Sequence, residues 1–174
     1  KVPFDNLYSR AVIFDAIKNE NFDPGKSVVL SPDMGSVKMS QGYAKNLGMN
    51  FAIIDKRRYA PNKAEVSHLI GKLQDRDVLI IDDMIDTAGT TVNAAEAAFD
   101  KGAKSVTAVA THGVLSGSAI EKLEKSKIKK VLITDTIEIS NQRKIEKLKV
   151  VSVSKVFAEA VKRVHNGESV SALF

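Results

Sequence analysis

The sequence predicts an α/β fold in which one mainly parallel sheet is flanked by helices. Short runs rich in Val, Ile and Leu alternate along the chain with longer amphipathic stretches, a pattern typical of repeated strand–helix–strand units. The chain has 174 residues, of which 44% are hydrophobic. This is enough to bury the core of one compact domain, so a single domain over residues 1–174 is expected.

Six apolar runs are expected to form the strands. Five of them are dominated by Val, Ile or Leu, and the six occupy residues 27–31, 51–55, 77–82, 105–111, 130–134 and 150–153. The run over residues 78–81 is continuous, as in a strand buried on both faces of a parallel sheet. Helical periodicity predicts helices over residues 8–19, 37–47, 91–101, 119–125 and 155–165. The last helix ends before Asn166 and Gly167, a typical terminator. The segment around His68 is also expected to be helical.

Composition argues against several classes of function. The chain has no Cys, so no disulfide framework can form. No apolar stretch approaches the ~20 residues that span a bilayer, so we expect no membrane partner and a cytoplasmic location. The net charge is +5, but Lys and Arg are scattered, aromatic residues make up only 6%, and no nucleic-acid motif is present. We therefore expect no nucleic-acid partner.

The strongest functional pattern follows the third apolar run, in the segment VLIIDDMIDTAGTTVNA. Asp82 and Asp83 come at the carboxyl end of a buried strand, where open α/β sheets bind ligands. An ionised Asp only accepts hydrogen bonds, so an adjacent pair suits the hydroxyl groups of a sugar. The competing interpretation is that both are solvated residues at the end of a strand.

The next six residues form a loop suited to a phosphate. They supply a flexible glycine, three hydroxyl groups and small side chains that let backbone N–H groups approach an anion: Asp86, Thr87, Ala88, Gly89, Thr90 and Thr91. A helix is expected to follow, and its positive N-terminal end would face the loop. The alternative is that Asp86 and Thr87 only cap this helix.

A second candidate anion loop follows the first strand, in the sequence SPDMGS. Proline and glycine punctuate the segment, and exposed amides there could face a diphosphate group. The residues concerned are Asp33, Met34, Gly35 and Ser36. The alternative is an ordinary strand-to-helix turn with Ser31 or Asp33 as a cap.

Lys56, Arg57 and Arg58 follow the second apolar run and precede a long polar connection that is expected to be mobile without ligand. A charge run in such a place is usually just solvated. Among the histidines, His68 and His165 are expected to be structural, whereas His112 could line a site or be a hydrogen-bonded residue at the end of a strand. No zinc spacing and no nucleophilic triad is apparent.

These motifs occur in a familiar order along the chain. SPDMGSVK, IDKRR, the acidic-pair segment, THGVLSG, ITDT and the ending RVHNGESVSALF together resemble ribose-phosphate pyrophosphokinases, the phosphoribosyl diphosphate synthetases. The acidic pair and its loop also match the motif of type I phosphoribosyltransferase folds. The resemblance covers essentially the whole chain but only the C-terminal half of that family, so we expect that the N-terminal, ATP-side domain is absent.

The resemblance implies a role for each motif. Asp82 and Asp83 would take the ribose hydroxyls, and the loop from Asp86 to Thr91 would take the 5-phosphate. The loop from Asp33 to Ser36 would handle the diphosphoryl group, with Asp33 binding Mg²⁺. Catalytic cations on a mobile loop would be Lys56 and Arg58, with Arg57 structural. The family usually has Gly at the position of Ser36 and Arg at that of Met39.

The implied activity is transfer of the diphosphoryl group of ATP to ribose 5-phosphate, for nucleotide biosynthesis, by a homo-oligomeric enzyme. Adenine recognition would then fall mainly to the absent half and a neighbouring subunit. Two alternatives stay open. A phosphoribosyltransferase would consume phosphoribosyl diphosphate, the product of that reaction, although no base-recognition segment is found. A non-catalytic regulatory paralogue would be expected to have lost the phosphate loop or the Lys/Arg pair, and this chain retains both.

Overall fold

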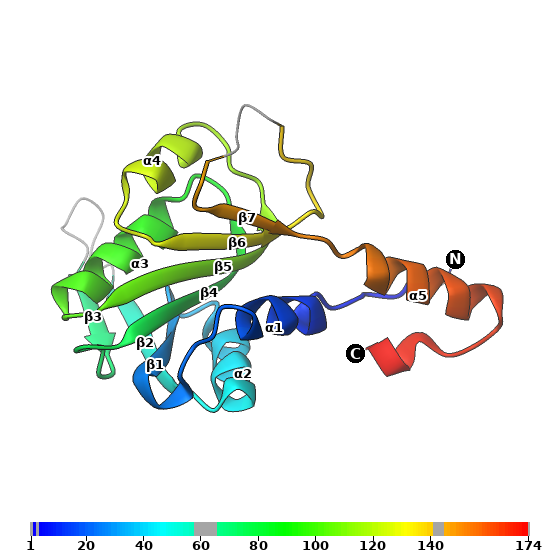
Figure 1. The fold of residues 1–174 in the computed structure, drawn as a ribbon, viewed down its shortest axis with the longest axis horizontal. Coiled ribbons are helices and arrows are strands. Elements are labelled where there is room, and N and C mark those ends of the chain that lie inside the picture. The colour runs from blue at the N-terminus through cyan, green and yellow to red at the C-terminus, as the bar shows by residue number, and fades with distance from the viewer. Residues whose placement is uncertain (1, 3, 58–65, 141–144, 174) are drawn as a thin grey trace.

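In the computed structural model, which describes all residues except 1, 3, 58–65, 141–144 and 174, one sheet forms the centre of the molecule (Figure 1). Seven strands within this described part have the order β3-β2-β1-β4-β5-β6-β7. Only the β2–β3 pair among them is antiparallel. The strands are β1 (Ser27–Ser31), β2 (Asn50–Arg57), β3 (Val66–Ile70), β4 (Asp77–Ile85), β5 (Ser105–Gly113), β6 (Lys130–Thr134) and β7 (Leu148–Val151). The predicted mainly parallel α/β sheet is confirmed.

Helices cover both faces of the sheet, as Figure 1 shows. The helices α1 (Arg10–Lys18) and α2 (Val37–Leu47) pack on one face, and α3 (Gly89–Asp100) and α4 (Ala119–Lys125) pack on the other. Successive strand residues point to opposite faces, so Val28 and Leu30 join the α3–α4 core while Val29 joins the α1–α2 core. Burial on both faces explains why the strands are continuous apolar runs.

The strand order places a topological switch between β1 and β4. From β1 the chain moves outward to β2 and β3, then returns to β4 on the other side of β1 and continues outward to β7. The connections that leave β1 and β4 therefore diverge, which opens a crevice at the carboxyl ends of these strands. Both predicted anion loops start at this crevice.

The region after β2 differs from the prediction. His68 lies in β3 rather than in a helix, and β3 pairs with β2 so that Asp55 is opposite His68. A short apolar pattern cannot distinguish a helix from an edge strand by itself, and here the pairing with β2 decides. Lys56 and Arg57 also belong to β2 instead of following it.

Other boundaries moved by a few residues. β4 and β5 run further than expected, to Ile85 and Gly113, so Asp82 and Asp83 lie within the last part of β4 rather than at its very end. β7 begins at Leu148 rather than at residue 150 and ends at Val151, because Leu148 pairs with Val131 of β6. α3 begins at Gly89, earlier than the predicted start at residue 91.

The C-terminal helix α5 (Ser154–His165) projects from the body of the domain, with the short 3₁₀ helix η3 (Val170–Leu173) folded back beside it (Figure 1). A further 3₁₀ turn, η1 (Pro24–Lys26), leads into β1. None of the described helices combines the length and apolar character that a membrane span requires.

Candidate functional site

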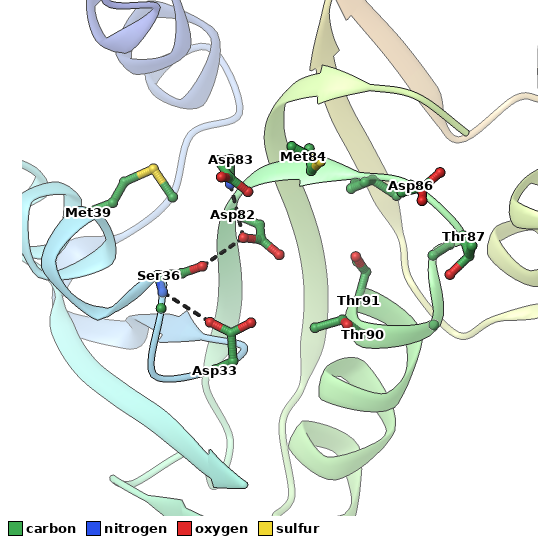
Figure 2. A pocket seen from close by; sticks show the side chains of 14 residues that line it. Asp33, Ser36, Met39, Asp82, Asp83, Met84, Asp86, Thr87, Thr90 and Thr91 are labelled. Atoms are coloured by element: carbon green, nitrogen blue, oxygen red, sulfur yellow. Dashed lines mark hydrogen bonds between the residues drawn. The ribbon is translucent and has the colours of Figure 1, made fainter. Parts of the chain in front are cut away.

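A cavity of about 590 Å³ lies at the switch between β1 and β4. Its walls come from the β1–α2 loop, the end of β4, the β4–α3 loop and the first turn of α3 (Figure 2). The lining residues are Asp33, Gly35, Ser36, Met39, Asp82, Asp83, Met84, Ile85, Asp86, Thr87, Ala88, Gly89, Thr90 and Thr91. The fold thus brings the two predicted anion loops and the acidic pair to one site.

The β1–α2 loop is organised by Asp33 and Ser36. An Asp33 Oδ1 accepts a hydrogen bond from the Ser36 N–H at 3.0 Å, and the Ser31 hydroxyl donates to the Asp33 carbonyl at 2.8 Å. Asp33 therefore closes the turn before α2, but the residue that caps α2 is Ser36, with no side-chain capping bond, and not Ser31 or Asp33 as the alternative interpretation expected. It also lines the cavity, with its second carboxylate oxygen outside that hydrogen bond. The turn and the candidate ligand role are therefore compatible.

Ser36 links the two acidic parts of the cavity. Its hydroxyl donates to Asp82 Oδ1 at 2.7 Å, while its N–H donates to Asp33 (Figure 2). The sequence analysis noted only that the resembling family usually has Gly at this position. The contact with Asp82 spans 46 residues of chain, so no local pattern could have indicated it.

Asp82 is partly buried and has two donors to the same oxygen. Besides Ser36, the Asp83 N–H donates to Asp82 Oδ1 at 3.0 Å. Burial raises the pKa of Asp82 above its usual value, and the nearby carboxylates of Asp33 and Asp83 add to that rise, while the two hydrogen bonds oppose it. The pair is thus asymmetric, since Asp83 is exposed at the mouth of the cavity.

The β4–α3 loop faces the β1–α2 loop across the cavity, and Figure 2 shows Thr90 and Thr91 opposite Asp33. The residue that caps α3 is Ala88, with a left-handed φ of 60°, and no side chain caps the helix. The first amides of a helix have no intrahelical partner, and here they lie at the cavity wall. The interpretation of Asp86 and Thr87 as simple helix caps is therefore wrong.

The remaining candidate residues lie in different parts of the structure. Met34 is 61% exposed and does not line the cavity. Lys56 lies in β2 opposite Ser67, and its side chain is outside the described part of the structure. All of Arg58 is outside it too.

Met39, Met84 and Ile85 line the cavity, although the sequence analysis did not place them in the site. His112 Nδ1 lies 2.8 Å from Thr136 Oγ1, which makes it a hydrogen-bonded residue at the end of β5.

The arrangement suits Mg²⁺ with substrate oxygens completing its shell. Among the described residues, no three His, Cys, Asp or Glu side chains are grouped to hold a metal by themselves. Mg²⁺ commonly binds through one or two carboxylates, several waters and substrate phosphates. Asp33 offers a carboxylate oxygen at the edge of a cavity with a candidate phosphate loop opposite, so the residues present fit such an ion.

Comparison with known proteins gives concordant results. The family model described as the phosphoribosyl synthetase-associated domain matches residues 57–174. A ribose-phosphate pyrophosphokinase of Caldanaerobacter subterraneus subsp. tengcongensis is 54% identical over 99% of this chain and 54% of its own length. The chain thus spans about half the length of the curated relatives it matches.

Solved structures agree with the fold. The crystal structure of phosphoribosylpyrophosphate synthetase from Mycobacterium smegmatis matches with a TM-score of 0.80 and 29% identity, over 91% of this chain and 50% of that one. The adenine phosphoribosyltransferase (APRTase) from Giardia lamblia matches with a TM-score of 0.57 and 19% identity, over 71% of this chain and 76% of that chain. The latter likeness shows a shared fold and no more.

Proposed function

Because the chain belongs to the phosphoribosyl synthetase-associated family, we propose that its cavity binds ribose 5-phosphate. The observation that carries the proposal is the pairing of the exposed Asp83 and partly buried Asp82 with the uncapped N-terminus of α3 across one cavity. Carboxylates accept hydrogen bonds from the ribose hydroxyls. The free amides and positive end of α3, with the hydroxyls of Thr90 and Thr91, bind the 5-phosphate.

Calorimetric titration of the chain with ribose 5-phosphate tests this proposal. Ribose 5-phosphate should bind more tightly than ribose or inorganic phosphate, since only the whole molecule engages both walls. Equal affinity for ribose 5-phosphate and inorganic phosphate would reduce the cavity to an anion site, and no binding by a folded chain would overturn the proposal.

We further propose that the complete protein uses this site to transfer a diphosphoryl group from ATP to ribose 5-phosphate, as a ribose-phosphate diphosphokinase. The similarity to ribose-phosphate pyrophosphokinases over 99% of the chain supports this. Since the chain spans about half of such relatives, the ATP side of the reaction is assigned to the other half. The 174-residue chain alone should then form little or no AMP from ATP and ribose 5-phosphate. Robust AMP formation would contradict that assignment.

In this mechanism Asp33 is proposed to hold Mg²⁺ beside the diphosphate, with the amides of the β1–α2 loop facing the same group. The ion supplies positive charge to the transferring phosphates. Thermal unfolding checks the metal assignment without turnover. Mg²⁺ with pyrophosphate should raise the melting temperature of the wild-type chain and raise that of Asp33→Asn much less. An equal rise in both would remove Asp33 from the proposed site.

Lys56 and Arg58 are proposed to stabilise the charge that develops during transfer. Lys is a compact point charge and Arg can contact two oxygens, so fixed cations near the phosphates favour the transition state over the ground state. In the complete enzyme, Lys56→Ala should lower kcat far more than it raises either KM. Arg57→Ala is the matched control and should be mild. Equal, modest effects at all three positions would indicate a diffuse basic surface.

A phosphoribosyltransferase is distinguished by one assay. Such an enzyme releases pyrophosphate from phosphoribosyl diphosphate only when a nucleobase is added, whereas the proposed synthetase does not respond to the base. Homo-oligomeric assembly and a cytoplasmic location stay predictions, which analytical ultracentrifugation and cell fractionation would check.

A further inference from the structure

The candidate phosphate loop of the cavity (residues 86–91) is hydrogen-bonded to a neighbouring segment to which the sequence analysis assigned no role in the site. This segment is the β5–α4 loop (residues 114–118), which precedes α4. The Leu115 N–H donates to the Ile85 carbonyl at 3.0 Å, and the Ser116 N–H donates to the Asp86 carbonyl at 3.1 Å. Two consecutive backbone hydrogen bonds thus continue the contact of β4 with β5 into the start of the phosphate loop.

Two side chains extend this attachment. The Ser116 hydroxyl donates a short hydrogen bond to Asp86 Oδ1, and the Lys122 ammonium of α4 donates to the Thr87 carbonyl at 3.1 Å. Hydrogen bonds with one ionised partner are stronger than neutral ones. The loop is therefore held at two successive residues, Asp86 and Thr87, just before it turns into α3.

The turn itself needs such support. Ala88 has φ of 60° and Leu115 has φ of 52°, both in the left-handed region that non-glycine residues avoid. Both side chains are almost completely buried, Ala88 at 3% and Leu115 at 1% exposure. A conformation of this kind persists only where the surroundings fix it. The hydrogen bonds from the β5–α4 loop and from Lys122 supply part of those surroundings, together with the burial of both side chains.

The contact of Lys122 also fixes the orientation of the peptide bond between Thr87 and Ala88. The described chain has no cis peptide bond, so the Thr87 carbonyl and the Ala88 N–H, which share one peptide plane, point in opposite directions. Lys122 does not line the cavity, whereas Thr87 and Ala88 do. A carbonyl held toward Lys122 turns the Ala88 N–H away from that side chain, so this peptide is oriented to offer an anion its N–H rather than its carbonyl oxygen.

We propose that Ser116 and Lys122 are positioning residues that hold the phosphate loop in its anion-binding conformation before ligand arrives. This inference rests on the proposed binding of ribose 5-phosphate. Preorganised donors bind the phosphate more tightly, because no binding free energy is lost in ordering the loop. The two side chains act through Asp86 and Thr87 and do not contact the ligand.

The test combines ligand affinity with hydrogen exchange of the unliganded chain. Ser116→Ala should weaken ribose 5-phosphate binding about tenfold, in the range expected from losing one charge-assisted hydrogen bond, while ribose without phosphate should bind as before. Ser116→Thr keeps the hydroxyl and should restore most of the affinity. Lys122→Met should weaken binding by roughly threefold, since an exposed contact contributes less.

Matched controls lie in the same segment. Ser118 is exposed and makes no side-chain cap bond at the start of α4, so Ser118→Ala should leave affinity unchanged. Lys125 is one turn from Lys122 and pairs with Glu121 at 2.6 Å, so Lys125→Met should also have no effect. Losses as large in these controls would mean a general effect of charge or helix stability and would overturn the proposal.

Hydrogen exchange separates this proposal from the proposed function. In Ser116→Ala the amides of residues 86–91 should exchange at least several-fold faster than in the wild type, with the rest of the sheet unchanged. If exchange is unchanged, the loop is not held by Ser116 and the proposal fails. If exchange rises but ribose 5-phosphate affinity does not fall, the attachment is structural only, which also overturns it. A wild-type chain that binds no sugar phosphate would overturn the proposed function, while exchange would still show whether the attachment exists.

Discussion

On the α3 side of the cavity, the loop backbone is held by donors from the β5–α4 loop and from Lys122, whereas on the β1–β4 side three carboxylates lie together. The first wall is fixed before ligand binds. The second wall carries mutual repulsion that the hydrogen bonds from Ser36 and from the Asp83 N–H offset in part, and that hydroxyl donors or a cation of a ligand would relieve further. The comparison shows two ways to prepare one site, by fixing donors on one side and by concentrating acceptors on the other.

The largest effect is expected at the fixed wall. Ala88→Val places a β-branched residue at a buried left-handed position and should reduce the free energy of unfolding by about 2–4 kcal/mol, with loss of phosphate binding. Ala88→Gly tolerates the same φ and should keep both stability and binding near the wild type. Urea unfolding and calorimetry of the two variants check this. Equal destabilisation by Gly and Val would show that φ at Ala88 is not what the loop requires.

A substitution in the acidic wall should lower the affinity for ribose 5-phosphate rather than the stability of the fold. Asp83 is exposed, so Asp83→Ala should weaken ribose 5-phosphate binding by about 1–3 kcal/mol, the cost of leaving hydrogen-bonding partners unpaired, with little change in melting temperature. Asp100→Ala, at the far end of α3, is the control. Unchanged affinity with a lowered melting temperature would make Asp83 a structural residue.

Glu20, a carboxylate outside the cavity, provides a comparison in which the charge is compensated by two lysines. Burial alone would raise the pKa of Glu20, but hydrogen bonds from Lys130 and Lys149 outweigh it and lower the pKa. Its ionised form therefore stabilises the fold above the ordinary Glu pKa, and this contribution is lost as pH falls through the lowered value. Glu20→Gln should cost about 1–2 kcal/mol at neutral pH and progressively less in acid. A constant difference from pH 3 to pH 8 would contradict the ion-pair origin.

The smallest effect should have the opposite sign. Since burial and neighbouring carboxylates raise the pKa of Asp82, the folded state binds its proton more tightly than the unfolded state does. Stability therefore falls as pH rises from the ordinary Asp value of about 3.9 through the raised pKa. Asp82→Asn keeps an oxygen acceptor for Ser36 and removes the charge. It should gain a few tenths to about 1 kcal/mol at pH 8 and nothing near pH 3, while losing sugar-phosphate affinity. A loss of stability at pH 8 would show that the ionised form is favoured.

Much of the fold and of the cavity could be predicted from the sequence. Continuous apolar runs such as Val28 to Leu30 and Val78 to Ile81 become central strands because both faces of the sheet are covered, and local sequence is enough to encode that burial. The acidic pair and the candidate phosphate loop both line the cavity, and local sequence was again enough to single them out. Each is a contiguous segment at the carboxyl end of a strand, where its chemistry can be recognised without knowing its neighbours.

What the tertiary structure alone decided involves contacts between distant segments. The pairing of β3 with β2 places His68 in a strand, and the bond from Ser36 joins the two acidic segments across 46 residues. Ser116 and Lys122 reach the phosphate loop across 30 and 35 residues. Local propensity fixes which segments form strands and helices, but a hydrogen bond between distant segments depends on sheet order and register. Those are set by packing over the whole domain.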